Sequence, residues 1–212
     1  MVRKHKVEGG KLAVKDIKAL LNASYDKNIN TNDFVLDPSV SNERSSVFHN
    51  PKTGQTVVAH RGTDSATDWG NNLVYGIGGD WLYKKTPRFK DAQKVQEKAE
   101  KKYGTQNLST LGHSQGAKIA ELLGNKDREI ITLNKASRIG SNVRNANQYD
   151  IRSSGDAVSA LNPFQKTTGR EIVIPKTSIN PLEQHSIDIL DQLPQEEMIG
   201  QGKGGKWGLH AV

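Results

Sequence analysis

Residues 108–123 read LSTLGHSQGAKIAELL, and this stretch decides the fold. Its first four residues, with a leucine at each end, predict a strand, while the spacing of apolar residues over 115–123 predicts an amphipathic helix. Between them Gly112-His113-Ser114-Gln115-Gly116 forms the G-x-S-x-G pattern, in which a serine occupies a sharp strand-to-helix turn. Glycines let the neighbouring backbone approach closely, and the helix N-terminus adds positive potential beside the serine. Ser114 is therefore the candidate nucleophile, and the alternative is a glycine-rich turn with a solvent-facing serine.

The segments around this motif predict an α/β protein with a mostly parallel central sheet flanked by helices, because strands alternate with helices along the chain. Helices are expected over 13–25, 87–103 and 183–193, and further strands over 45–49, 55–60, 129–133, 148–152 and 171–174. We expect a single domain over 1–195. Residues 196–212 form a Gly-rich basic tail, for which we expect a flexible chain.

Composition excludes several classes of protein. The 212 residues include no cysteine, which rules out a disulfide scaffold, a Cys-ligated metal site and a thiol nucleophile. No apolar run approaches the ~18 residues that a membrane span needs, and the basic N-terminus has no apolar signal-peptide segment after it. We therefore expect a soluble protein, either cytoplasmic or packaged or exported by a route that needs no signal peptide.

The net charge of +7 is unevenly distributed. Residues 84–102 contain eight Lys or Arg side chains against three acids, and residues 1–20 contain six against two. Such a basic face favours an anionic membrane surface as partner, and the alternative is a lysine-rich surface that only aids solubility. Nucleic acid is disfavoured because charge alone supports it, with neither a recognition helix nor a stacking aromatic motif.

A serine nucleophile needs a histidine base and a carboxylate that orients it, and in α/β-hydrolases both follow the serine in the chain. Only His185 and His210 follow Ser114, and His210 lies in the Gly-rich tail, so His185 is the preferred base. The preferred acid is Asp156, in a turn just past a predicted strand. Asp150, inside that strand, and Asp188, in the same predicted helix as the histidine, remain alternatives.

Two backbone N–H groups are expected to hold the oxyanion. One belongs to Gln115, directly after the nucleophile. The other is expected in the loop that follows the strand 55–60, where Arg61-Gly62-Thr63 combines a glycine with a hydroxyl residue.

These patterns together resemble the class 3 lipase family. A strand leads into Arg61-Gly62-Thr63, an Asp68-Trp69 pair follows, and Gly-His-Ser-x-Gly comes some fifty residues later. The resemblance spans about residues 45–190. It implies an α/β-hydrolase fold and a triacylglycerol lipase or phospholipase A1-like esterase that needs no metal or organic cofactor. It also implies that Thr63 supplies an oxyanion donor, and that Asp68, Trp69 and the stretch to Leu73 form a substrate-binding lid.

Two positions depart from the family pattern. His60 stands where an aromatic residue is common, and Gln115 replaces the usual leucine, which suits a less hydrophobic acyl pocket or an amphiphile with a charged head. We expect His113 to pack under the nucleophile elbow, the strand-to-helix turn that carries Ser114. Two hypotheses follow: a serine carboxyl-ester hydrolase that acts on acylglycerol or phospholipid, and a catalytically silent α/β-hydrolase-fold module that binds a membrane or a partner through its basic face.

Overall fold

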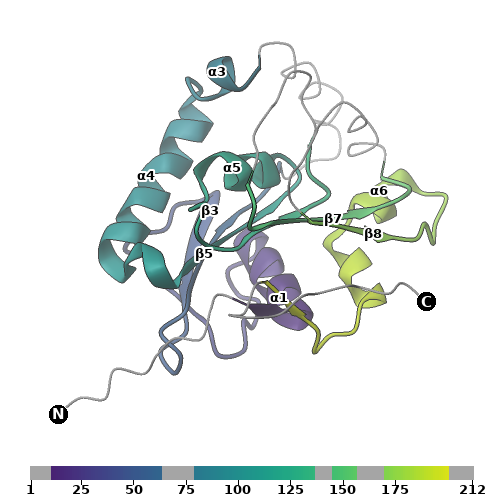
Figure 1. Ribbon diagram of the computed structural model, residues 1–212, viewed down its shortest axis with the longest axis horizontal. Helices are drawn as coiled ribbons and strands as arrows, with labels where there is room; N and C mark the ends of the chain where they lie inside the picture. The colour runs from purple at the N-terminus through teal and green to yellow at the C-terminus, as the bar shows by residue number, and fades with distance from the viewer. Residues whose placement is uncertain (1–10, 64–78, 137–144, 157–169, 201–212) are drawn as a thin grey trace.

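A seven-stranded sheet in the order β2-β3-β4-β5-β6-β7-β8 forms the centre of the protein (Figure 1). The computed structural model describes residues 11–63, 79–136, 145–156 and 170–200. Neighbouring strands are antiparallel from β2 to β4 and parallel from β4 to β8, so the expected mostly parallel sheet is confirmed. The strands are β2 (Val35–Leu36), β3 (Ser45–His49), β4 (Thr56–His60), β5 (Leu108–His113), β6 (Ile130–Leu133), β7 (Gln148–Ser153) and β8 (Arg170–Ile174).

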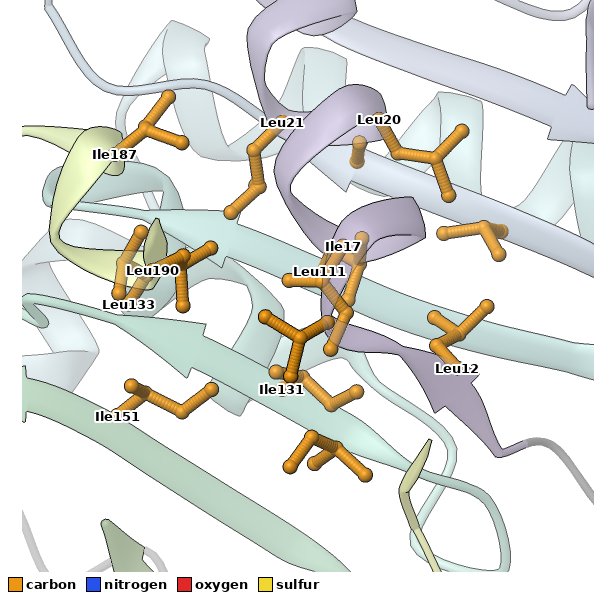
Figure 2. Packing of buried hydrophobic residues seen from close by; sticks show 14 of the residues in the cluster. Leu12, Ile17, Leu20, Leu21, Leu111, Ile131, Leu133, Ile151, Ile187 and Leu190 are labelled. Atoms are coloured by element: carbon orange, nitrogen blue, oxygen red, sulfur yellow. The ribbon is translucent and has the colours of Figure 1, made fainter. Parts of the chain in front are cut away.

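Helices cover both faces of this sheet. Helix α1 (Val14–Tyr25), expected over 13–25, buries an apolar stripe that includes Ile17, Leu20 and Leu21, in one cluster with side chains of β5, β6 and β7. Figure 2 shows these α1 side chains packed over the strand residues. Helix α4 (Pro87–Tyr103) packs through Val95 and Ala99 on β3, β4 and β5 in a second cluster. Side chains alternate along a strand, so β5 contributes Leu111 to the first cluster and Leu108 to the second.

The ends of α4 form as the sequence predicts. Thr86 precedes the helix and its Oγ1 accepts a hydrogen bond from the N–H of Phe89 at 3.3 Å. Pro87 occupies the first helical position, where its missing N–H costs nothing. Gly104 ends the helix with φ of +80°, a conformation that glycine adopts without strain.

The C-terminal region differs from the prediction. The expected helix 183–193 is broken into α6 (Pro181–His185) and a 3-10 helix, η4 (Ile187–Gln192). At the break Ser186 is extended and its Oγ accepts from the N–H of Asp188 at 3.1 Å, because a serine hydroxyl competes well for the first N–H groups of a new helical turn.

The packed chain also continues past residue 195, where the tail was expected to begin. Strand β9 (Met198–Ile199) pairs antiparallel with β1 (Leu12–Ala13), and Ile199 is buried. Two-residue strands are too short to show a period of two, so neither was predicted. Among the described residues, α3 (Gly79–Tyr83), the 3-10 helix η2 (Thr105–Asn107) and the short strand β2 were also not predicted. No helix in the described part of the chain has the length and apolar content that crossing a membrane requires.

Candidate active site

Ser114 lies at a sharp turn between β5 and α5 (Gln115–Leu123), with φ of +57° and ψ of −122°. Few non-glycine residues adopt such a conformation, and its cost of about 1–3 kcal/mol points to a functional role. The turn is held in place because the N–H of Ser114 donates to the carbonyl of Leu133 at 3.0 Å, at the end of β6. The sequence prediction of a strand, a serine turn and a helix is therefore confirmed as geometry.

The Arg61-Gly62-Thr63 loop lies directly against this serine. A Cβ placed on Gly62 would lie 2.9 Å from the Cβ of Ser114, and one on Gly116 would lie 2.0 Å from the carbonyl oxygen of His60. Only glycine fits at either position, because real Cβ atoms do not approach so closely. The loop after β4 and the first turn of α5 therefore meet at Ser114, which is where oxyanion donors have to lie if this serine is the nucleophile.

His185 and Asp156 form a buried pair. The Nδ1 atom of His185 lies 2.8 Å from Oδ1 of Asp156, and the two residues are 3% and 1% exposed. A carboxylate at Nδ1 fixes the imidazole tautomer with its proton on Nδ1, which leaves Nε2 as the nitrogen that can take a proton. The two side chains come from the end of α6 and from the turn after β7, 29 residues apart.

Asn134 holds both members of this pair to the sheet. It follows β6 with φ of +46°, and its side-chain amide donates to the carbonyl of Gln184 at 3.1 Å. Its Oδ1 accepts from the N–H of Ser153 at 3.1 Å, and the carbonyl of Ser153 in turn accepts from the N–H of Asp156. The residue before the histidine and the turn that carries the aspartate are thus tied to one buried amide.

The expectation that His113 only packs under the elbow is incomplete, because its ring is hydrogen-bonded on both sides. Its Nε2 lies 2.8 Å from the carbonyl oxygen of His185, and its Nδ1 lies 2.8 Å from Oη of Tyr25. The Tyr25 hydroxyl oxygen also accepts from the N–H of Gly62 at 2.6 Å. Burial, together with the smaller effect of the neighbouring His185, lowers the pKa of His113 to about 3, so its ring is neutral at neutral pH.

Two arginines support the Arg61-Gly62-Thr63 loop, which we call the oxyanion loop after its expected role, from its other side. Arg88, in the first turn of α4, donates from Nη2 to the carbonyl of Arg61 at 2.6 Å. The Arg61 guanidinium is itself buried, with Nη2 3.1 Å from Oε1 of Glu43. The backbone of the loop is thus fixed by side chains from α1 and α4.

The structure separates the alternative carboxylates from the histidine. Asp150 lies inside β7 and is held by Lys135, with Nζ 3.1 Å from its Oδ1. Asp188 lies on η4 and pairs with Lys18 at 3.1 Å. Asp156 alone of the three candidate acids has a hydrogen bond to His185 among the described residues.

The expected lid residues Asp68, Trp69 and Leu73 fall outside the described residues, as does His210, which was set aside as the base. Thr63 is the last described residue of its loop and is half-buried, while Gln115 is the first residue of α5. Sequence reasoning missed Tyr25, Arg88 and Asn134, since nothing in their local patterns points to partners far along the chain.

The arrangement of the sheet, the elbow and the loop can be compared with known proteins. No family model matches the sequence, and no curated protein is similar to it. Among solved structures, the Lip2 lipase of Yarrowia lipolytica shares 14% identity with a TM-score of 0.53, over 84% of this chain and 86% of that one.

The chain has an α/β-hydrolase fold. A triacylglycerol lipase of Penicillium expansum is also similar, at 16% identity and a TM-score of 0.49, over 77% of this chain and 79% of that one. The α/β-hydrolase fold that the sequence resemblance to class 3 lipases implied is confirmed by the likeness to the Lip2 lipase.

Proposed function

We propose that this α/β-hydrolase is a serine carboxyl-ester hydrolase that acts on lipid, either acylglycerol or phospholipid. The observation that carries the proposal is the buried 2.8 Å contact between His185 Nδ1 and Asp156 Oδ1. The backbone of His185 is in turn hydrogen-bonded to His113, the residue that precedes the strained Ser114. A nucleophile on a strained turn, a histidine and an orienting carboxylate are the parts that acyl transfer needs.

The residues have the following roles in the proposed reaction. Ser114 Oγ attacks the ester carbonyl carbon while its proton moves to Nε2 of His185, and the N–H groups of Thr63 and Gln115 stabilise the oxyanion. The bond to the leaving alcohol then breaks, and the alcohol oxygen takes the proton from His185. Water attacks the acyl-enzyme and gives a proton to His185, which returns it to Ser114 as the fatty acid leaves. Asp156 stays ionised and holds the imidazole throughout.

The proposal is tested with a fluorophosphonate that labels active serines. We expect one label per chain, on Ser114, together with turnover of a soluble short-chain ester. The Ser114→Ala variant is the matched control and should take no label. A folded wild-type protein that takes no label and hydrolyses neither soluble ester nor dispersed lipid would contradict the proposal and favour the silent module.

A membrane surface is a further part of the proposal, and a specific surface supports it. Trp81 and Leu82 on α3 are 66% and 49% exposed, and Nζ of Lys85 lies 3.3 Å from the centroid of the Trp81 ring. We define the α3–α4 surface as Trp81 and Leu82 together with exposed lysines that follow α3 or lie in the first three turns of α4: Lys84, Lys85, Lys90, Lys94 and Lys98. Aromatic and basic side chains side by side suit the interface of an anionic lipid bilayer.

A further inference from the structure

A chain of three hydrogen bonds crosses the candidate active site from the oxyanion loop to the histidine segment. It runs from the N–H of Gly62 to Tyr25 Oη at 2.6 Å, from Tyr25 Oη to His113 Nδ1 at 2.8 Å, and from His113 Nε2 to the carbonyl oxygen of His185 at 2.8 Å. These four residues lie in α1, in β5, in the loop after β4 and at the end of α6. The two middle residues have no role in the proposed reaction.

Only one arrangement of protons satisfies all three bonds. A carbonyl oxygen accepts and cannot donate, so Nε2 of His113 must carry the proton. A neutral ring then has a bare Nδ1, which accepts from the hydroxyl of Tyr25, and the hydroxyl oxygen accepts from the N–H of Gly62. Every bond therefore points the same way, and each donor is matched to one acceptor.

Burial keeps this arrangement fixed at the pH at which a hydrolase of this kind works. His113 is 8% exposed, and because its pKa is about 3, the ring is neutral at every pH well above 3. The groups that face the chain are the His185 ring, with centroids 5.1 Å apart, and the Arg61 guanidinium, 5.7 Å from the centroid of the Tyr25 ring. Asp156 also acts on His113 electrostatically and raises its pKa, which burial outweighs.

We propose that Tyr25 and His113 are positioning residues that couple the oxyanion loop to the catalytic histidine, so that the N–H of Thr63 and the imidazole of His185 are held in register about Ser114. This inference rests on the proposed function. Neither side chain contacts the reacting atoms in this scheme. Each instead holds a backbone group close to the reacting groups. Tyr25 holds the N–H of Gly62, the residue before Thr63, and His113 holds the carbonyl of His185.

The expected consequence is a loss of turnover with little change in substrate binding. A displacement of the oxyanion donors or the base by about 1 Å can cost on the order of 100-fold in rate, whereas ground-state binding of the acyl chain does not involve these groups. We expect Tyr25→Phe to lower kcat by about 10–100-fold on a soluble short-chain ester. The KM should stay within about two-fold of the wild-type value, because the contacts that bind the substrate in its ground state are unchanged. The rate of labelling by fluorophosphonate should fall in parallel, since the phosphonate adduct uses the same donors.

Two changes at His113 cut the chain at different points. Asn places its amide near the position of Nδ1 and retains an acceptor for Tyr25, whereas Gln places its amide near Nε2 and retains a donor for the carbonyl of His185. Both variants should lower kcat. Adding Tyr25→Phe should lower kcat further in the His113→Asn background, and by less in the His113→Gln background, where Tyr25 has lost its bond to residue 113 but still accepts from the N–H of Gly62.

Tyr103→Phe is the matched control, because it also removes one tyrosine hydroxyl that hydrogen-bonds a partner, here Asp37 Oδ2 at 2.6 Å, away from the candidate site. Thermal unfolding of both Tyr→Phe variants separates a loss of folding from a loss of positioning. The inference is supported if Tyr25→Phe loses turnover at unchanged KM while Tyr103→Phe, melting at a similar temperature, does not.

The positioning role of Tyr25 and His113 is overturned if wild-type protein is labelled at Ser114 and the two Tyr→Phe variants have the same kcat. That outcome would leave the proposed function unchanged. Failure of the wild-type protein to be labelled or to hydrolyse any ester would instead overturn both. A Tyr25→Phe variant with a raised KM, a lowered kcat and a much lower melting temperature would show that Tyr25 has a structural role only. That result would also overturn the inference.

Discussion

The imidazole of His185 and the carboxylate of Asp156 meet at 2.8 Å in the interior of the protein, 29 residues apart in sequence. The turn Ser153–Asp156 places the acid, since the N–H of Asp156 donates to the carbonyl of Ser153. The side chain of Ser153 in turn contacts Gln184, the residue before the histidine. The two halves of the pair are therefore fixed by contacts that involve neither functional side chain.

This geometry predicts different effects for two neighbouring aspartates. Asp156→Asn should cost up to about 10⁴-fold in kcat, because an amide at this position favours the wrong tautomer of His185. Asp150→Asn leaves that pair intact but weakens the contact with Lys135, so it should lower thermal stability and leave kcat near that of the wild type. Turnover of a soluble ester and the melting temperature, measured on both variants, check this. A crippled Asp150→Asn enzyme beside an active Asp156→Asn enzyme would reverse the assignment of the acid.

The strained turn predicts a stability difference between two inactive variants. Ser114 has φ of +57°, which glycine tolerates and alanine does not. Ser114→Gly should therefore melt above Ser114→Ala, and neither should hydrolyse ester. Ser24 is the control, because it lies inside α1, where Gly is less stable than Ala by about 0.5–1 kcal/mol and the order should be reversed. The same order at both sites would mean that the turn at Ser114 carries no strain.

Much of this site could be predicted because its signals are local. The strand-serine-helix stretch shows its apolar periods and its glycines within sixteen residues, and the caps of α4 are adjacent to the helix. The break at Ser186 could not be predicted, since apolar residues continue across it and only the competing serine hydroxyl ends the helix. Tyr25 and Arg88 act through backbone groups of a distant loop, and Met198–Ile199 becomes a strand only because Leu12–Ala13 lies beside it. Such long-range contacts leave no pattern in a single sequence.

A buried ionic cluster behind the elbow predicts a large loss of stability on mutation. Lys135 Nζ lies 2.8 Å from Glu121 Oε1 and 3.1 Å from Asp150 Oδ1, with Lys135 and Glu121 almost fully buried. Lys135→Met would leave two carboxylates without this cation, which costs about 3–5 kcal/mol of the free energy of unfolding. The exposed pair Lys15–Glu196 is the control, and Lys15→Met should cost less than about 1 kcal/mol. Urea unfolding measures the free energy of unfolding of both variants. Equal losses would show that the buried ion pairs contribute no more to stability than the exposed one.

Two buried neutral histidines predict an acid-labile fold. Burial lowers the pKa of His60 and of His113 to about 3, against 6.5 for an exposed histidine. Between about pH 6.5 and 3 the unfolded chain therefore binds protons that the folded chain does not, so stability falls as pH falls through this window, by about 1.4 kcal/mol per pH unit for each histidine.

Carboxylates also titrate in the lower half of this window, so the histidine contribution is isolated by difference. His113→Asn should reduce the slope of unfolding free energy against pH by one proton, whereas His49→Asn, at a half-buried site, should reduce it less. Urea unfolding at several pH values between 5 and 6.5 gives the slopes. An unchanged slope in His113→Asn would mean that His113 takes up a proton in the folded protein.

The α3–α4 surface predicts binding that depends on lipid charge and on salt. Each Lys near an anionic bilayer adds about 1 kcal/mol of attraction, which salt screens over a Debye length of about 10 Å at 0.1 M. Reversal of Lys90, Lys94 and Lys98 to Glu should abolish sedimentation with phosphatidylglycerol-containing vesicles and lower activity on them, while a soluble ester is hydrolysed as before.

The matched control reverses Lys52, Lys126 and Lys176 to Glu, which changes the net charge equally at exposed positions outside this surface. Trp81→Ala should weaken binding to the same vesicles at high salt as well, because its contribution is apolar burial and is not screened. If both triple variants bind equally weakly, the effect is one of net charge and the surface is not a docking site. If the Lys90, Lys94 and Lys98 variant binds as the wild type does, these lysines serve only to solvate the helix.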